Sequence, residues 1–168
     1  MMFSRPLLTV MMIIVMLTAG AWLWRTCTES DEAKIHRLVE TGKNAVEEKS
    51  LRGVISLMSP DYHDDLGLTV ESVRPMLQRL FLGVQGLRVE IRDQTLSDLT
   101  GGAEATAHLS LAVVVSGALQ GQPLYLMGTP SQPARLTLTV VKEGRHWLVR
   151  EVQGLRQSAY PALNDPSP

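Results

Sequence analysis

The sequence has little cysteine, few aromatic residues and no large excess of charge of either sign. A single cysteine among 168 residues excludes a disulfide framework, a zinc cage of thiolates and an internal redox pair. Aromatic residues make up 5% of the chain and the net charge is −1, so the sequence lacks the basic and aromatic signature of nucleic-acid binding. The length suits one domain with an appendage, and 45% hydrophobic residues suit a folded chain.

Residues 7–24 form an apolar stretch without a charged side chain, with the sequence LLTVMMIIVMLTAGAWLW. At about 1.5 Å per residue, a helix of this length spans about 27 Å, which is close to the hydrocarbon thickness of a bilayer. Arg5 precedes the stretch, and Trp22, Trp24 and Arg25 are typical of a membrane–water interface. Residues 1–27 are therefore predicted to be a transmembrane anchor through which the chain contacts the membrane.

A cleaved signal peptide is the alternative interpretation of the same residues. The small residues at 19–21 match an A-x-A cleavage site, and cleavage after Ala21 would release a secreted protein. Both interpretations place the body outside the cytoplasm, in the bacterial periplasm at the inner membrane if the anchor is kept. Lipid attachment at Cys27 is not expected, because Trp24, Arg25 and Thr26 do not form the small-residue motif that it needs.

Hydrophobic residues recur with a helical period in three segments after this leader. A helix over 31–50 has an apolar face and a charged face, predicted to be solvated, that includes Lys43 and Glu47. A shorter helix is predicted over 51–58, and residues 61–67 (DYHDDLG) are predicted to form a loop. A third helix begins after Thr69 or Ser72 and ends near Gly83; Pro75 bends it if Thr69 is the cap.

After Gly86 the hydrophobic period changes to two, which indicates β-strands. Strands are predicted over 87–92, 104–115, 134–142 and 146–152. Helices followed by strands predict an α+β fold, with three helices packed on a four-stranded antiparallel sheet over residues 28–156. Residues 157–168 hold three prolines and no periodicity, and are predicted to be a disordered tail.

Three segments together resemble a known family: ISLMSPDYHDDLG, TVESVRPMLQRLF and the closing LTLTVVKEGRHWLVREV. Residues 31–153 resemble a nuclear-transport-factor-2-like domain, which also has a cystatin-like fold. The resemblance implies a curved sheet wrapped round a long helix, which gives a cone with an apolar pocket. The family includes ketosteroid isomerases, scytalone dehydratases, polyketide cyclases and non-catalytic binding or dimerising domains.

The inward positions of the predicted strands carry no titratable side chain, so no acid–base pair is expected in the sheet. The remaining candidates for catalysis are the clustered residues Asp61, Tyr62, His63 and Asp64, followed by Asp65. A structural role in a turn is the favoured interpretation of this cluster. No motif predicts a metal site or a cofactor.

Residues 117–133 form a long insertion rich in proline, glycine and glutamine. Its apolar residues Leu124, Tyr125, Leu126 and Met127 indicate either an extension of the hairpin, which is favoured, or a docking surface. These four residues and Tyr62 are the predicted contacts to a ligand or a protein partner.

Three functions remain open at the level of sequence. The favoured one is a non-catalytic, membrane-tethered extracytoplasmic domain that binds a protein partner or a small apolar ligand. The second is a small isomerase, dehydratase or cyclase-like enzyme with a pocket near Asp61–Asp65. The third is a structural scaffold that forms a homodimer through its open sheet face.

Overall fold

The computed structural model describes residues 29–102 and 104–158, which divide into a short unit ending at Lys34 and a larger unit from Ile35. The predicted anchor at 1–27 and nearly all of the predicted tail lie outside the described residues. Within the short unit, the Ser30 hydroxyl accepts a hydrogen bond from the Ala33 amide at 3.2 Å, and Lys34 pairs with Asp31 at 3.1 Å. No helix in the described part of the chain is long and apolar enough to cross a membrane.

The first two predicted helices are present and end slightly earlier than expected. Helix α2 covers Asp31–Glu47, and its apolar face buries Ile35, Leu38, Val39 and Ala45. Helix α3 covers Leu51–Ile55 and begins with the Ser50 hydroxyl accepting a hydrogen bond from the Gly53 amide at 3.1 Å. Helix α3 ends before residue 58 because a strand begins there.

The prediction of a loop over 61–67 is wrong for residues 61–64, because Met58–Asp64 forms strand β1, and it holds for the turn at 65–67. Strand β1 pairs in parallel with β6 (His146–Gln153), Met58 opposite Val149 and Asp64 opposite Val152, with a bulge between residues 58 and 63. Proline and aspartate are rare in strands, so the local composition does not indicate a strand here. Pro60 is tolerated because β1 is an edge strand, where an amide need not donate to a neighbour.

The third predicted helix is α4, which covers Val70–Gly83. Thr69 is its N-cap, and the Ser72 hydroxyl accepts a hydrogen bond from the Thr69 amide at 2.8 Å. Pro75 therefore lies inside the helix and cannot donate an intrahelical hydrogen bond, as expected for the Thr69 alternative. Phe81 of α4 packs with Val84 and Leu87 in a second hydrophobic cluster.

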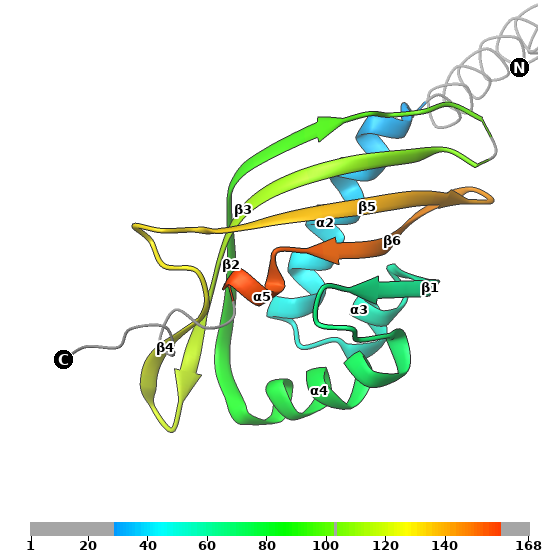
Figure 1. The fold of residues 1–168 in the computed structure, drawn as a ribbon. Coiled ribbons are helices and arrows are strands. Elements are labelled where there is room, and N and C mark those ends of the chain that lie inside the picture. The colour runs from blue at the N-terminus through cyan, green and yellow to red at the C-terminus, as the bar shows by residue number, and fades with distance from the viewer. Residues whose placement is uncertain (1–28, 103, 159–168) are drawn as a thin grey trace, which may run out of the picture. The chain divides into compact units, whose positions relative to one another are not determined.

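The sheet has six strands, so the predicted four-stranded sheet is wrong in number (Figure 1). The other strands are β2 (Val84–Ser97), β3 (Thr106–Leu119), β4 (Gln122–Met127) and β5 (Ala134–Glu143). The strand order in the sheet is β1-β6-β5-β3-β2, and β4 pairs with the C-terminal part of β3. All strand pairs are antiparallel except β1 with β6. The insertion is therefore a hairpin extension, as favoured. Helix α5 (Leu155–Ser158) follows β6.

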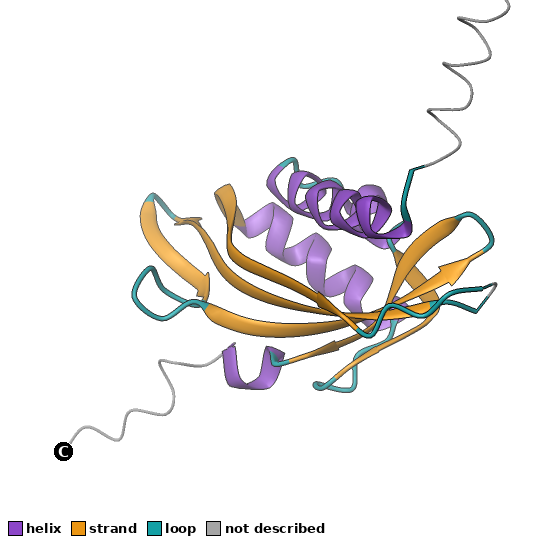
Figure 2. Ribbon diagram, turned by 90° about the horizontal axis from the view of Figure 1, so that it is seen from above, coloured by secondary structure: helices purple, strands orange, loops and turns teal. Residues whose placement is uncertain are grey.

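The sheet is curved, and α2 and α4 lie on its concave side (Figure 2). The alternation predicted for the strands is confirmed: Ala107, Leu109 and Val140 are fully buried against Ile35 of α2, whereas His108 is exposed. Trp147 is also buried in this main core. The concave face of the sheet is therefore the apolar surface that α2 has to cover.

Candidate functional site

An apolar cavity of about 280 Å³ lies between α2 and the concave face of the sheet. Of the described residues that line it, only Lys43 has a charged side chain, and Tyr62 is the only other polar one. The apolar wall comes from the helices and from inward positions of the strands, namely Leu38, Val39, Val46, Val54, Leu57, Val89, Ile91, Leu111, Val113, Leu136, Leu138 and Val149. Gly42 of α2 also lines the cavity, and the space that a side chain would take there is left open.

A buried tyrosine–aspartate pair lies on β1, and its tyrosine lines the cavity. The exposed fractions of Tyr62 and Asp64 are 5% and 7%, and the Tyr62 hydroxyl donates to Asp64 Oδ2 at 3.3 Å. Asp64 Oδ1 accepts two further hydrogen bonds, from the amides of Leu66 at 3.0 Å and Leu68 at 2.9 Å. The Asp64 carboxylate therefore holds the chain that leads from β1 to α4.

The environment of Tyr62 raises the pKa of its hydroxyl well above the ordinary value of 10. Burial is the largest cause, because it disfavours the phenolate, and the negative charge of Asp64 adds to it. The hydrogen bond to Asp64 acts in the same direction, since it stabilises the protonated phenol. Tyr62 is therefore a hydrogen-bond donor over the physiological pH range.

The neighbouring Asp65 has a structural role of its own. Its Oδ2 atom accepts hydrogen bonds from the amides of Gly154 at 2.8 Å and Arg156 at 3.2 Å, which joins the end of β1 to the turn after β6. Asp65 Oδ1 is buried without a hydrogen-bond partner among the described residues. The second carboxylate therefore fixes the C-terminal turn.

The five clustered candidates do not form one site. Asp61 and His63 are exposed, whereas Tyr62 and Asp64 are buried, because side chains alternate along β1. His63 Nδ1 lies 3.2 Å from the Asp61 carbonyl oxygen, and His63 Nε2 lies 3.8 Å from Glu151 Oε1. Only Tyr62 of this cluster lines the cavity.

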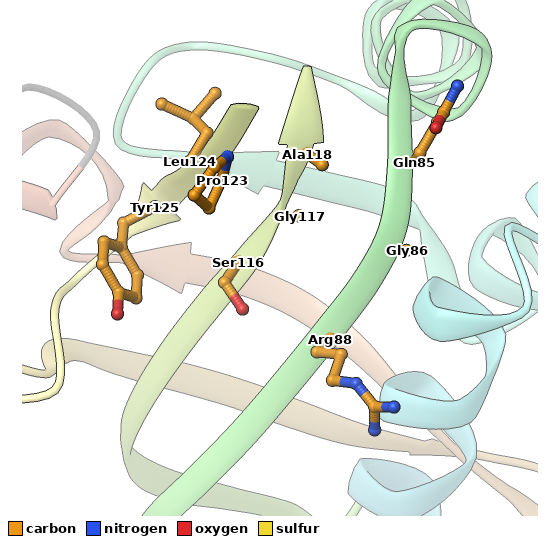
Figure 3. Close-up of a pocket in the computed structure, with 9 residues that line it drawn as sticks. All are labelled: Gln85, Gly86, Arg88, Ser116, Gly117, Ala118, Pro123, Leu124 and Tyr125. Carbon is orange, nitrogen blue, oxygen red and sulfur yellow. The ribbon is translucent and has the colours of Figure 1, made fainter. Parts of the chain in front are cut away.

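Two of the four apolar residues of the insertion lie against the interior, and the other two are exposed. Leu126 packs against the second hydrophobic cluster, and Met127 lines the apolar cavity. Leu124 and Tyr125 are exposed, at 40% and 53%. They border an open hollow of about 510 Å³ between β2, β3 and β4, with Arg88 on its opposite side (Figure 3).

Two residues of helix α2 were missed by the sequence pattern. Lys43 and Glu47 were assigned to the solvated face, but Lys43 lines the cavity and Glu47 Oε1 accepts a hydrogen bond from the Val89 amide at 2.9 Å. A helical pattern shows which residues share a face, but not how far a curved sheet reaches around the helix. No three His, Cys, Asp or Glu residues among those described are grouped to hold a metal ion.

We expect Tyr62→Phe to lower the free energy of unfolding by about 1–2 kcal/mol at pH 8, because it removes a buried hydrogen bond to a carboxylate. Since the folded pKa lies above 10, the unfolded state loses this proton first as the pH rises. The contribution of Tyr62 is thus complete below about pH 10 and is lost at higher pH. Urea unfolding from pH 8 to 11.5 measures both effects.

The exposed Tyr125 provides the matched control, and Tyr125→Phe should change the stability at pH 8 by less than about 0.5 kcal/mol. Equal losses in the two variants, or an unchanged alkaline slope in Tyr62→Phe, would contradict the role assigned to the buried pair.

No family model matches the chain, and no curated protein matches its sequence. Solved structures do match. A candidate aromatic ring hydroxylase from Novosphingobium aromaticivorans is 17% identical, with a TM-score of 0.61 over 73% of this chain and 86% of that chain. A candidate scytalone dehydratase from the same organism is 13% identical, with a TM-score of 0.61 over 73% and 81%.

A protein of unknown function with a cystatin-like fold from Nostoc punctiforme is 16% identical, with a TM-score of 0.52 over 73% of this chain and 88% of that chain. At these identities the likeness concerns the fold alone. The body of this chain has the nuclear-transport-factor-2-like, cystatin-like fold that its sequence resembles.

Proposed function

We propose that the body of this protein binds a small apolar ligand in the cavity between α2 and the sheet, without transforming it. The observation that carries the proposal is the cavity wall, whose described residues are apolar except for Tyr62 and Lys43. A ligand that leaves water for such a wall gains about 25 cal/mol for each Å² of apolar surface that is buried. Small-molecule sites are typically concave and mostly apolar, with a few polar groups that orient the ligand.

The geometry of β1 favours binding over catalysis. An enzyme with this pocket would need an acid or base that is free to exchange a proton with the ligand. The Asp64 carboxylate already accepts three hydrogen bonds, and the Tyr62 hydroxyl already donates to it. Asp61 and His63 do not line the cavity. We therefore assign the pair a role in supporting the fold.

Gly42 allows the cavity to be filled with little disturbance of the fold. A Cβ atom at Gly42 would lie 3.5 Å from Leu57 Cδ1, which is an ordinary contact distance. We expect Gly42→Leu to abolish binding of the neutral probe 1-nonanol, because the new side chain occupies the cavity. Titration calorimetry of the full chain in lipid nanodiscs, corrected with empty nanodiscs, measures the binding.

Gly42→Ala is the matched control for this variant. It should raise the free energy of unfolding by up to about 1 kcal/mol, since alanine favours the helix, and it should retain most of the binding. Unchanged nonanol binding in a folded Gly42→Leu variant would show that the ligand site lies elsewhere.

The membrane tether is a second part of the proposal, and it is supported by the uncharged stretch at 7–24 and its flanking Trp and Arg residues. A charge at the centre of such a segment opposes insertion by about 2.5–3.5 kcal/mol. With alkaline phosphatase fused after Pro168, the wild type should be active in the membrane fraction. The double variant Ile14→Arg/Val15→Arg should lose that activity, and Thr100→Arg, in an exposed loop, should keep it.

Full activity of the double variant, or an inactive wild-type fusion, would contradict the tether. Activity of the wild type in the medium and not in the membrane fraction would instead identify the leader as a cleaved signal.

Contact with a protein partner or a second copy is supported by the exposed Leu124 and Tyr125 on β4. Exposed apolar side chains next to a free strand edge favour association.

If the contact is a homodimer, sedimentation equilibrium of the full chain, solubilised in amphipol without nanodiscs, should show dimers. Tyr125→Ser should raise the dissociation constant of the dimer at least tenfold. Gln120→Ser, in the exposed turn of the same hairpin, should leave them unchanged. A wild type that stays monomeric at high concentration would remove the homodimer.

A further inference from the structure

Among the described residues, Lys43 is the only charged one at the wall of the apolar cavity. It is partly buried on α2, and within the described residues no carboxylate lies within ion-pairing distance of it. Glu47, one turn further along the helix, uses Oε1 to accept the Val89 amide, and Glu40, on the preceding turn, is exposed. The ammonium group of Lys43 is therefore available to a ligand.

A lysine in this position places its two ends in different surroundings. The alkyl stem of lysine covers apolar surface while its ammonium group stays in contact with water. The stem of Lys43 thus continues the apolar wall, and we expect its ammonium group to lie where the cavity meets the solvent. A ligand with an apolar body and one anionic end would satisfy both parts.

The other polar group of the wall does not compete for this role. The Tyr62 hydroxyl donates its proton to Asp64 Oδ2, so it has no proton left to donate to an anionic ligand end. Deep inside the cavity, an anionic ligand atom would therefore lose its hydration without a donor to replace it, and burial of an unpaired charge costs more than burial of a neutral polar group. The ligand's charge has to lie at the border.

The size of the cavity limits the length of the apolar part. At about 30 Å³ for each water-sized group, 280 Å³ accommodates about nine non-hydrogen atoms. The volume is at the lower end of the range for small-molecule sites, about 300–1,000 Å³. Two long acyl chains do not fit, so a diacyl lipid is excluded as a fully enclosed ligand.

We infer that the ligand is a single-chain monocarboxylate of medium length, with its alkyl chain in the cavity and its carboxylate paired with Lys43. This inference rests on the proposed function and adds the class of ligand. Affinity should rise about fourfold with each added methylene, the factor that corresponds to about 0.8 kcal/mol per buried group, and should stop rising near nine carbons.

The test compares nonanoate with 1-nonanol, which have the same chain length but differ in charge at one end. Both are titrated into the full chain in lipid nanodiscs, and empty nanodiscs give the correction for partition into lipid. Nonanoate should bind the wild type at least threefold more tightly than nonanol, and Lys43→Met should remove that preference. Lys34→Met changes a lysine on the same helix that does not line the cavity, and it should keep the preference.

A measurement on the wild type alone makes the test independent of how the variant folds. The pKa of bound [1-¹³C]nonanoate, followed by its carboxyl chemical shift, should lie below that of the free acid, because a nearby cation favours the carboxylate. A bound pKa equal to or above the free value would overturn the pairing with Lys43.

The outcomes separate this inference from the proposed function. If nonanol binds as tightly as nonanoate and Lys43→Met changes neither, the cavity binds apolar ligands and the assignment of a carboxylate is wrong. If the wild type binds neither probe, the proposed function fails together with the inference. If affinity continues to rise beyond about twelve carbons, the chain is not enclosed by this cavity and the inference fails.

Discussion

The contact between α2 and the curved sheet is the interaction on which the rest of the body depends. The inward faces of β2, β3, β5 and β6 are apolar, and a sheet face of this kind has to be covered to be stable in water. Helix α2 covers it with Ile35, Leu38 and Val39, which pack in the main core. Gly42 has no side chain that could fill the space between the helix and the sheet, so part of the interior stays open.

Polar residues then fix the edges around this apolar centre. Glu47, the last residue of α2, accepts a hydrogen bond from the Val89 amide of β2 at 2.9 Å. Lys49, in the turn after α2, donates to the Val84 carbonyl oxygen of β2 at 2.5 Å. At the other edge, Asp64 and Asp65 hold the loop to α4 and the turn after β6. Gly154 is needed in that turn because its φ is +94°, and a Cβ atom would collide with the Arg135 carbonyl oxygen. Asp64 and Asp65 thus hold the end of the edge strand β1 in place.

The fold of this body is shared with proteins described as candidate enzymes, and binding without catalysis is our proposal for it. Fold does not determine function, and chemistry depends on which side chains reach the pocket. Here the strand that carries the acids directs Tyr62 to the cavity and directs the carboxylate of Asp64 to backbone amides. Among the described residues, Lys43 is the remaining charged residue of the wall.

The sequence by itself determined the three helices, the antiparallel strands and the apolar inward face, because each depends on local periodicity that the printed residues carry. It also determined the hairpin at 117–133 as the favoured interpretation. Only the tertiary structure decided that Met58–Asp64 is a strand, since a parallel pair with β6 involves residues about ninety positions apart and overrides a local composition that disfavours strands. The position of Lys43 at the cavity and the division of the Asp61–Asp65 cluster between two faces follow from that strand and from the curvature of the sheet, which no local pattern encodes.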